Sequence, residues 1–290
     1  MDPILIFIQA LNGLQLGIML FLMAAGLTLV FGVMNLINLA HGSLYMMGAY
    51  LAATLQQQTG SFLLAVLLAI PLTILIGMLI EVIVLRSLYD RDHLDQVLAT
   101  FALILFFNEL VRIVWGPQAY FMAAPALLSG SMQILPGVSY PVLRIGIIAV
   151  GMAVAIFLYV LIAYTRLGML IRAGATNREM VGALGVNIRL LYTLVFGLGA
   201  ALAGLAGMMA GPILSVEVGM GESIIILTFV VIVIGGIGSI RGAFIASIAV
   251  GVADTFGRVL LPPALASMVI YVLMAAVLYW RPQGLFPAHG

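Results

Sequence analysis

Long apolar runs make up most of this sequence, and the charged residues stand mainly between them. Hydrophobic residues account for 64% of the chain, charged residues for only 7%, and the mean hydropathy is +1.28. Soluble domains carry roughly 25% charged residues, so this composition indicates an integral membrane protein. A helix that crosses a bilayer needs about 20 apolar residues, and the runs leave room for about eight or nine such helices. We expect one all-α domain over residues 1–290, a polytopic transmembrane helix bundle.

The apolar runs also place the expected spans, and the division of the first 56 residues decides between eight and nine. The opening segment Met1–Ile4 lacks the basic region and small-residue cleavage site of a signal peptide, so we expect the first run to be kept as a span. The spans are expected near Ile4–Phe31, Leu39–Leu55, Phe62–Leu85, Val97–Trp115, Val142–Tyr164, Leu190–Met209, Ile224–Ile234, Ala243–Leu261 and Ala266–Trp280.

The arginines predict the orientation of the chain, because cytoplasmic loops of membrane proteins carry an excess of Lys and Arg. When the spans are threaded alternately, eight of the eleven basic residues fall on one side, which we expect to be the cytoplasm. The carboxyl terminus is then cytoplasmic and, with nine spans, the amino terminus is external. The eight are Arg86, Arg91, Arg166, Arg172, Arg178, Arg189, Arg241 and Arg281.

The largest external element in this arrangement is the loop at about residues 116–141, which is rich in Pro, Gly and Ser. Two short strands, Met132–Leu135 and Val138–Tyr140, are predicted around its Pro136-Gly137 pair. Loops of this length are often functional, so this one is a candidate docking or gating surface, with a plain connector as the alternative.

Two residue types are absent from the chain, lysine and cysteine. Without lysine there is no phosphate-binding GxxxxGK[ST] loop and no Schiff base, so the chain cannot itself be a P-loop ATPase. Without cysteine there is no disulfide and no thiolate metal site. The net charge of +1 argues against nucleic acid as a partner. If ATP powers this protein, another polypeptide must bind it.

The polar segment at about residues 165–189 holds four of the eleven basic residues on the predicted cytoplasmic side. Thr176 and Glu179 have the spacing of a capping box, and Gly185 stands where a glycine would end the helix. They predict a short cytoplasmic helix whose Met180, Ala183 and Leu184 form an apolar face for a soluble partner. The plainer alternative is a helix lying on the membrane surface between two spans.

Polar residues interrupt the apolar stretch from Ile18 to Ala53, and a re-entrant or broken segment near the N-terminal third explains this better than exposure to lipid. A metal site at the single histidine of this cluster is not expected, because no second histidine or cysteine is spaced to help it. We expect the cluster to orient polar backbone at the break and hypothesise that it lines a pathway. Its members are Asn35, Asn38, His41, Ser43 and Tyr45.

Charged residues inside the predicted spans are few, and two of the acidic ones have an arginine three or four positions later. Glu109 with Arg112 and Asp254 with Arg258 are expected to pair along their own helices. Glu81 is expected to be an interface residue near Arg86. The glycine-rich run Gly235–Gly242 predicts a tight turn or a broken helix.

Three motifs, in order, resemble those of the LivH-type permeases of branched-chain amino acid ABC importers. Gly26–Tyr50 resembles the amino-terminal signature of that family, Arg172–Asn187 its cytoplasmic coupling loop, and Gly235–Ala243 its glycine-rich carboxy-terminal motif. One departure lies in the coupling helix, where Val181-Gly182-Ala183 replaces a more alanine-rich run. An interior glycine there weakens the helix by about 0.8–1 kcal/mol relative to alanine.

The resemblance implies a permease subunit that forms half of a translocation pathway and performs no covalent chemistry. Implied partners are a second permease (LivM-like, or a second copy of this chain), two cytoplasmic ABC ATPase subunits that bind ATP and Mg, an external solute-binding protein and membrane lipid. The implied location is the inner membrane of a prokaryote. The implied solutes are leucine, isoleucine and valine, with urea, amides and other amino acids as alternatives.

Together the residues and the resemblance assign two sets of candidate site residues, and no catalytic or metal-binding residue. The translocation pathway is expected to involve Asn35, Asn38, His41 and Ser43. Coupling to the ATPase is expected to involve Arg172, Asn177, Arg178, Glu179, Met180, Ala183, Leu184 and Gly185.

The rival from another class is an ATP-independent secondary transporter or channel for a small solute. It predicts a carboxylate relay deep in a span, and Glu109 and Asp254 are its candidates, although each has an arginine nearby. An intramembrane enzyme ranks lower, because the chain contains no HExxH or GxSxG motif.

Overall fold

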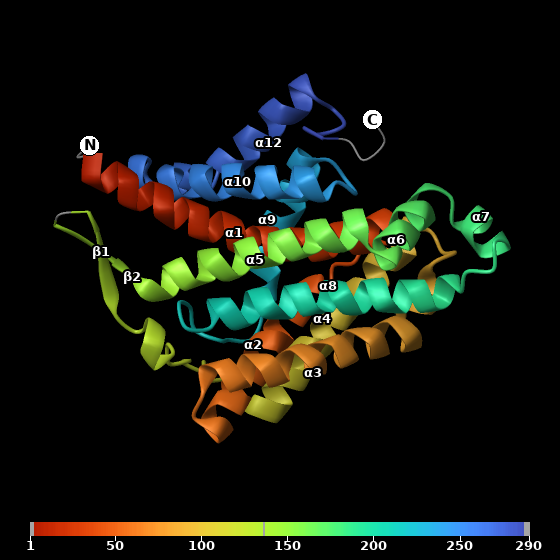
Figure 1. Ribbon diagram of the computed structural model, residues 1–290, viewed down its shortest axis with the longest axis horizontal. Helices are drawn as coiled ribbons and strands as arrows, with labels where there is room; N and C mark the ends of the chain where they lie inside the picture. The colour runs from red at the N-terminus through yellow and green to blue at the C-terminus, as the bar shows by residue number, and fades with distance from the viewer. Residues whose placement is uncertain (1–2, 136, 287–290) are drawn as a thin grey trace.

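The computed structural model describes residues 3–135 and 137–286 and consists almost entirely of α-helices (Figure 1). The helices are α1 (Pro3–Met34), α2 (His41–Thr59), α3 (Phe62–Ile83), the 3-10 helix η1 (Leu85–Leu88), α4 (His93–Trp115), the 3-10 helix η2 (Ala126–Leu128), α5 (Val142–Tyr164), α6 (Arg166–Thr176), α7 (Arg178–Ala183), α8 (Ile188–Ala210), α9 (Met220–Gly235), α10 (Ile240–Leu260), α11 (Pro263–Ala266) and α12 (Val269–Trp280).

Every apolar run predicted as a span contains a helix, and α5 has the predicted bounds. Within the described residues, seven helical segments are long and apolar enough to cross a bilayer, which makes the protein a multi-pass membrane protein. The last of them combines α11 and α12, at Pro263–Trp280. Two of the predicted spans are not among the seven. They are α9, which has 16 residues, and α2, which is less apolar and ends near the glutamines Gln56–Gln58.

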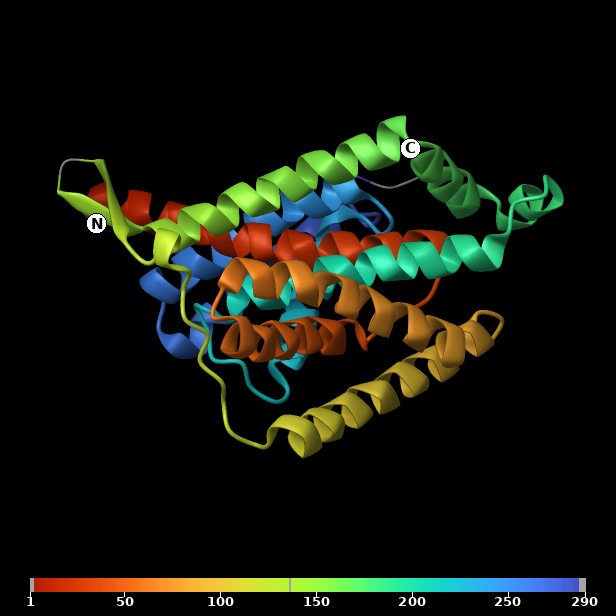
Figure 2. The same ribbon diagram turned by 60° about the horizontal axis from the view of Figure 1, so that its bottom comes forward.

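The long helix α1 forms the centre of the bundle, with α8 and α10 packed against it (Figure 2). In the apolar stretch of α1 that could cross a bilayer, 83% of the residues are buried, whereas the corresponding share is 11% for Pro263–Trp280 at the periphery. Small residues allow this close packing, as expected for helices in lipid. A Cβ atom at Gly17 or at Gly251 would overlap backbone atoms of the facing helix, so the α1–α10 contact requires glycine.

Helices α1 and α3 run in the same direction along the bundle (Figure 2). The chain must therefore return across the bundle between them. Residues 35–40 and α2 together therefore carry the chain back across it. The segment is not helical between Met34 and His41, and Asn35 adopts a left-handed conformation with φ of +53°. The predicted break in the N-terminal third is thus present in the backbone.

The loop at residues 116–141 contains the predicted hairpin, formed by antiparallel strands β1 (Ser131–Leu135) and β2 (Val138–Pro141). Pro136 lies outside the described residues. Elsewhere in this loop, Tyr120 pairs with Val216 through two backbone hydrogen bonds of 2.8 and 2.9 Å, so the loop closes over the segment between α8 and α9.

The predicted glycine turn joins α9 to α10, and Gly236 and Gly238 take positive φ values of 100° and 82°. Ser239 caps α10, since its Oγ accepts a hydrogen bond from the Gly242 amide. The C-terminal segment returns to this turn, where the Phe286 amide donates to the Gly235 carbonyl at 3.0 Å.

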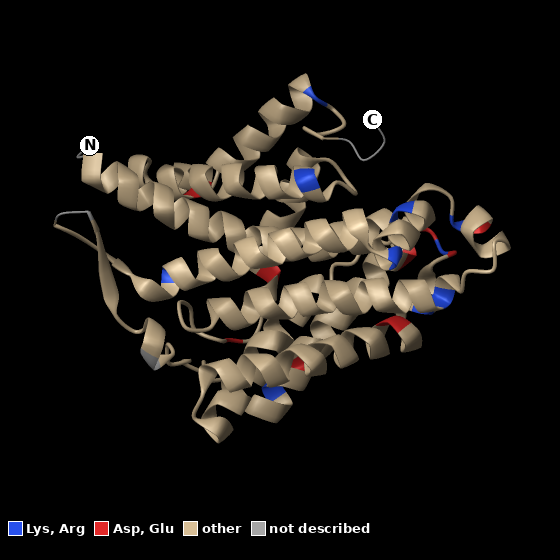
Figure 3. Ribbon diagram, viewed as in Figure 1, with Lys and Arg blue, Asp and Glu red and all other residues tan. Residues whose placement is uncertain are grey.

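Charged residues gather at the end of the bundle that carries α6 and α7, which we call the α7 end (Figure 3). Away from it, the expected ion pairs are present: Arg112 lies 3.0 Å from Glu109, and Arg258 lies 2.7 Å from Asp254. Glu81 lies near the end of α3 with Arg86 3.0 Å away, as expected, and its side chain is fully buried within the protein. Its carboxylate accepts hydrogen bonds from the Arg86 guanidinium and from a hydroxyl of α8, that of Thr193. Sequence spacing does not reveal the contact with α8.

Candidate functional site

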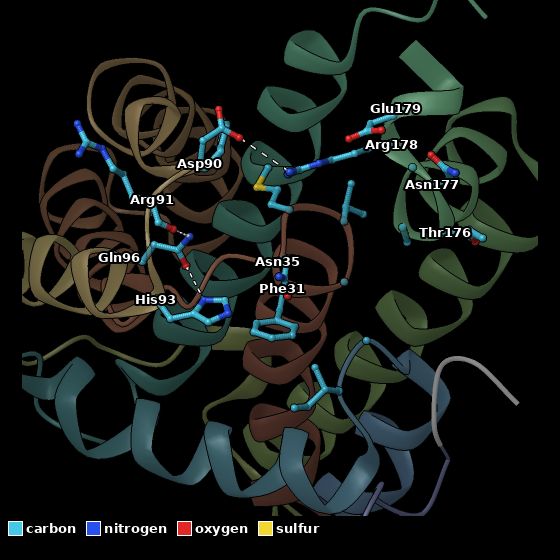
Figure 4. A pocket seen from close by; sticks show the side chains of 18 of the residues that line it. Phe31, Asn35, Asp90, Arg91, His93, Gln96, Thr176, Asn177, Arg178 and Glu179 are labelled. Atoms are coloured by element: carbon cyan, nitrogen blue, oxygen red, sulfur yellow. Dashed lines mark hydrogen bonds and ion pairs between the residues drawn. The ribbon is translucent and has the colours of Figure 1, made fainter. Parts of the chain in front are cut away.

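A cavity of about 840 Å³ opens at the α7 end, between the end of α1, the turn before α4, and the α6–α7 junction (Figure 4). Arg178 and Asp90 face each other across it at 3.8 Å. The lining residues are Phe31, Gly32, Val33, Met34, Asn35, Tyr89, Asp90, Arg91, Asp92, His93, Gln96, Gly174, Ala175, Thr176, Asn177, Arg178, Glu179, Ile237 and Gly238.

The cavity brings together residues from both predicted sets. Asn35 comes from the pathway set, and Asn177, Arg178 and Glu179 come from the coupling set. The remaining charged residues of its wall, Asp90, Arg91 and Asp92, lie in the turn between η1 and α4. Sequence reasoning used Arg91 only for the orientation of the chain and did not identify the two aspartates. The mixed charges of the lining residues give a polar, water-compatible wall without a dominant sign.

Gln96 connects three parts of this wall and was also missed. It is 2% exposed, and its side-chain amide donates to the carbonyls of Leu88 and Arg91, each at 3.2 Å. Its Oε1 accepts a hydrogen bond from the Ile37 amide at 3.4 Å. The broken segment after α1 is thereby attached to the turn before α4.

The predicted pathway residues do not all line one space. Asn35 lines the large cavity, whereas Asn38 and His41 are fully buried and line neither this cavity nor the smaller one described next. Both polar side-chain atoms of Asn38 lack a hydrogen-bond partner within the described residues. Buried amides are nearly always hydrogen-bonded, so an orphaned one marks a special position.

Ser43 lines a second cavity, of only about 10 Å³, where the first turns of α2 and α9 meet α4. Gly42 and Gly221 are in backbone contact there, and a Cβ atom on either would overlap the carbonyl of the other. The Asn108 side-chain amide donates to Glu222 Oε1 at 2.7 Å beside this contact. A space of this size holds about one water, so the protein is closed at this point.

Sequence reasoning did not identify Glu222 as part of this contact, because it lies just before the predicted span Ile224–Ile234. In the structure α9 begins earlier, at Met220. The available signal was an acidic residue two positions ahead of an apolar run and preceded by two glycines, Gly219 and Gly221. An acidic side chain in the first turn of a helix is favoured by the helix dipole.

The predicted capping box of α7 is wrong by one residue. Asn177 is the N-cap, with φ of −154° and ψ of 92°, and its Oδ1 accepts a hydrogen bond from the Met180 amide at 2.9 Å. Thr176 instead ends α6, and its hydroxyl donates to the Arg172 carbonyl at 3.0 Å. Glu179 lies in the first turn of α7, where a negative charge favours the helix.

The predicted end of α7 is confirmed at Gly185, which has φ of +87°. Its amide donates to the Gly182 carbonyl at 3.0 Å, and the Val186 amide donates to the Val181 carbonyl at 3.4 Å. This pair of hydrogen bonds is the Schellman pattern that ends helices at a left-handed residue.

The apolar face of α7 points away from the rest of the chain. Met180 is 59% exposed, Leu184 is 77% exposed, and Ala183 is also exposed. We call Met180, Ala183 and Leu184 the α7 face. On the opposite side, Val181 is buried and holds α7 against the bundle. Among the other coupling residues, Arg172 is exposed on α6.

The described residues contain no cluster of His, Cys, Asp or Glu that could hold a metal ion. The main features are a polar cavity, a closed backbone contact and an exposed apolar helix face, and none of them pairs a nucleophile with a base among the described residues.

Known proteins match the chain over nearly its full length. The family model for the permease component of branched-chain amino acid transport systems matches residues 9–278. The high-affinity branched-chain amino acid transport system permease protein BraD of Pseudomonas aeruginosa is 33% identical, over 96% of this chain and 94% of BraD. LivH of Escherichia coli K12, with the same description, is 29% identical, over 98% of this chain and 96% of LivH.

A probable branched-chain amino acid transport permease protein LivH from Methanocaldococcus jannaschii is 27% identical, over 92% of this chain and 88% of that protein. No solved structure matches the chain. The resemblance seen in the three sequence motifs is therefore confirmed over the whole membrane region. The chain belongs to the family of permease components of branched-chain amino acid transport systems.

Proposed function

We propose that the chain is the membrane-spanning permease subunit of an ATP-binding cassette importer and forms half of the translocation pathway. The solutes are branched-chain or related amino acids that a solute-binding protein delivers, as the names of the relatives suggest. The observation that carries the proposal is the α7 face, an exposed apolar helix surface at the charged end of a membrane bundle that has no lysine for a P-loop of its own.

The chain crosses the membrane nine times in this proposal. Residues 35–40 with α2 and residues 211–219 with α9 provide the two crossings that are too short or too polar to count as ordinary spans. Broken helices of this kind commonly form the transport site of membrane transporters. Their first turns meet at Gly42 and Gly221, and this backbone contact supports a closed point of the pathway between them.

The pathway runs from this closed point to the cavity at the α7 end. Ser43 borders the closed point and Asn35 borders the cavity, and the buried Asn38 and His41 lie between them in the chain. The large cavity makes the described conformation open toward the α7 end and closed beyond it.

The α7 end is the cytoplasmic side in this proposal, which is supported by the arginines gathered there. The carboxyl terminus then lies in the cytoplasm and the membrane is the inner membrane of a prokaryote. Two ABC ATPase subunits bind ATP and Mg, and one of them docks on the α7 face, so this chain needs no cofactor. A second permease, LivM-like or a second copy, completes the pathway, and nucleic acid has no role.

The coupling mechanism follows from the attachment of α7. Val181 and the two flanking helices fix α7 to the bundle, so a docked ATPase that closes on ATP moves α6 and α8 with it. Arg172, Arg178 and Glu179 surround the docking surface with charge, which favours a partner with complementary charges. Alternation between outward-open and inward-open states then moves the solute without any bond being made.

The test is a pull-down of the tagged chain from its native membrane, compared with Leu184→Asp and with Leu127→Asp as a matched control. Both leucines are strongly exposed, at 77% and 93%, but Leu127 lies in the loop at the other end. We expect the native chain and the control to retain P-loop ATPases and a second permease, and Leu184→Asp to lose the ATPases.

Transport completes this test, because the Glu179→Lys variant should insert normally and yet fail in ATP-dependent uptake of leucine, isoleucine and valine. Purification of the native chain alone, with solute transport in proteoliposomes that need no ATP, would overturn the proposal in favour of an ATP-independent secondary transporter or channel.

A further inference from the structure

Glu81 is a fully buried carboxylate at the end of α3, and the mechanism above does not use it. A buried charge is costly unless a counter-charge and several hydrogen bonds compensate it. Arg86 supplies both, since its Nε lies 3.2 Å from Oε1 and one terminal nitrogen lies 3.0 Å from Oε2. Glu81 therefore holds the turn after α3 in a fixed position.

Two hydroxyl groups complete the set of donors around Glu81. The Tyr89 hydroxyl donates to Oε1 at 2.6 Å, and the Thr193 hydroxyl donates to Oε2 at 2.6 Å. Arg86 also donates to the Thr193 oxygen at 2.9 Å. The hydrogen bond with Glu81 raises the pKa of Arg86, and burial raises the pKa of Tyr89, so both groups keep their protons.

Thr193 is the one member of this cluster that comes from a distant part of the chain, 112 residues after Glu81. It lies in the second turn of α8, and only residues 184–187 separate α8 from α7. The neighbouring Tyr192 is buried and packs edge-on against Tyr89, with ring centroids 5.0 Å apart. The base of α8 is thus attached to the turn between α3 and α4.

The same turn reaches α4 and α7 as well. Gln96 of α4 donates to two carbonyls of the turn, and Asp90 of the turn lies 3.8 Å from Arg178, the first residue of α7. The Asp90–Arg178 pair is exposed, and such pairs contribute little energy. The buried cluster around Glu81 is therefore the firm part of the connection.

We propose that Glu81, through Thr193, is the positioning residue that joins the α3–α4 hairpin to the base of α8, so that movement of α7 also moves α4. The inference rests on the proposed function, because it takes the docked ATPases as the source of the movement. Without this joint, α8 would pass the movement of α7 to α3 and α4 through packing contacts and the exposed Asp90–Arg178 pair alone.

Thr193→Val and Thr193→Ser form a matched pair of test variants. Valine keeps the shape of threonine but removes the hydroxyl, whereas serine keeps the hydroxyl and its hydrogen bond to Glu81. Both changes leave the α7 face and the two ion-paired side chains Glu81 and Arg86 in place, and only valine removes the hydrogen bonds that join Thr193 to that pair. The complex is isolated with the tagged chain and reconstituted with its solute-binding protein, and leucine import and ATP hydrolysis are measured on the same vesicles.

The expected result is a loss of coupling in Thr193→Val and in Glu81→Gln. The amount of leucine imported per ATP hydrolysed should fall at least fivefold, while the yield of assembled complex and the basal ATPase rate stay within twofold of the native protein. Thr193→Ser should keep the native ratio. A native ratio in Thr193→Val, or losses in all three quantities in proportion to complex yield, would show a purely structural role and overturn the proposal.

Distances between spin labels separate this joint from the proposed function, and the absence of native cysteine makes the labelling direct. One pair joins Leu98→Cys on α4 to Ile245→Cys on α10, and the other joins Met169→Cys on α6 to the same α10 site, all at exposed positions. ATP should change both distances in the native complex, and only the α6–α10 distance in Thr193→Val.

These two distances test the joint between α8 and the α3–α4 hairpin, whichever solute is transported. If ATP moves α4 in Thr193→Val as in the native complex, or moves α6 but not α4 in the native complex, the joint does not act as proposed. If the native chain binds no ATPase at all, the proposed function fails first, and the absence of any ATP-dependent distance change identifies that outcome.

Discussion

Asn177 closes the first turn of α7 with its side chain, which makes it the residue that starts the helix. Replacing an N-cap asparagine with alanine costs about 1 kcal/mol. We expect Asn177→Ala to speed hydrogen exchange of the α7 amides about fivefold, in line with that free energy. Thr176→Ala is the control, because Thr176 only donates back to α6, and it should leave exchange in α7 unchanged. A larger effect at Thr176 would restore the capping box expected from the sequence.

Residues whose role depends on near neighbours could be predicted, and those whose role depends on distant parts of the chain could not. Gly185 and the pairs of Glu109 and Asp254 with their arginines follow from spacings of a few positions. The burial of Glu81 depends on Thr193, which lies on another helix. The cap at Asn177 was misplaced because its position depends on where α6 ends, and the sequence does not mark that point.

At the scale of elements, α7 is a six-residue helix with a glycine inside it, and a helix this short has little stability of its own. A Cβ atom at Gly182 would lie 3.6 Å from Ile188 Cγ1, an ordinary contact. Gly182→Ala should therefore stabilise α7 by about 0.8–1 kcal/mol and slow exchange of its amides.

Gly185→Ala is the opposite control for the same helix. The left-handed conformation of Gly185 costs a residue with a Cβ atom about 1–2 kcal/mol, so this change should speed exchange in α7. If Gly182→Ala and Gly185→Ala change amide hydrogen exchange in the same direction, the stability of α7 does not control local unfolding at this surface.

The contact between α2 and α9 depends on two glycines that touch through their backbones. Backbone cannot move aside as a flexible side chain can, so Gly221→Ala should destabilise the bundle by about 3 kcal/mol, the upper end of the cost of overpacking. We expect a lower thermal unfolding temperature in detergent and less monodisperse protein. Gly130→Ala has open space around its Cβ position and should behave as the native chain. Equal stability of the two variants would show that α2 and α9 do not meet at this point.

The helices themselves were predictable because each apolar run is long, whereas their number as spans was not. Length and composition identify seven helical segments that could cross a bilayer, because α2 is too polar and α9 is too short to qualify. The arrangement in space supports the proposed crossing by residues 35–40 and α2, because α1 and α3 run in the same direction and the chain must return between them. Tertiary packing of α2 on α3 and α8 supplies the polar helix with partners other than lipid.

For the whole molecule, seven and nine crossings both leave the two termini on opposite sides, so the position of the carboxyl terminus cannot distinguish them. The internal loops can. If α2 and α9 each help to carry the chain across, Ser87 lies with α7 on the cytoplasmic side and Ser131 lies outside; with only the seven apolar spans, these sides are exchanged.

Because the chain has no cysteine, Ser87→Cys, Ser131→Cys and Gln283→Cys each introduce a single label site, and all three positions are exposed. An impermeant maleimide applied to intact cells should label only Ser131→Cys, and all three should react once the membrane is permeabilised. Labelling of Ser87→Cys from outside would place α7 on the external face, where no ATPase could dock. Such a result would remove the physical basis of both the coupling helix and the joint at Glu81, whereas labelling as expected puts the α7 face in the compartment that holds ATP.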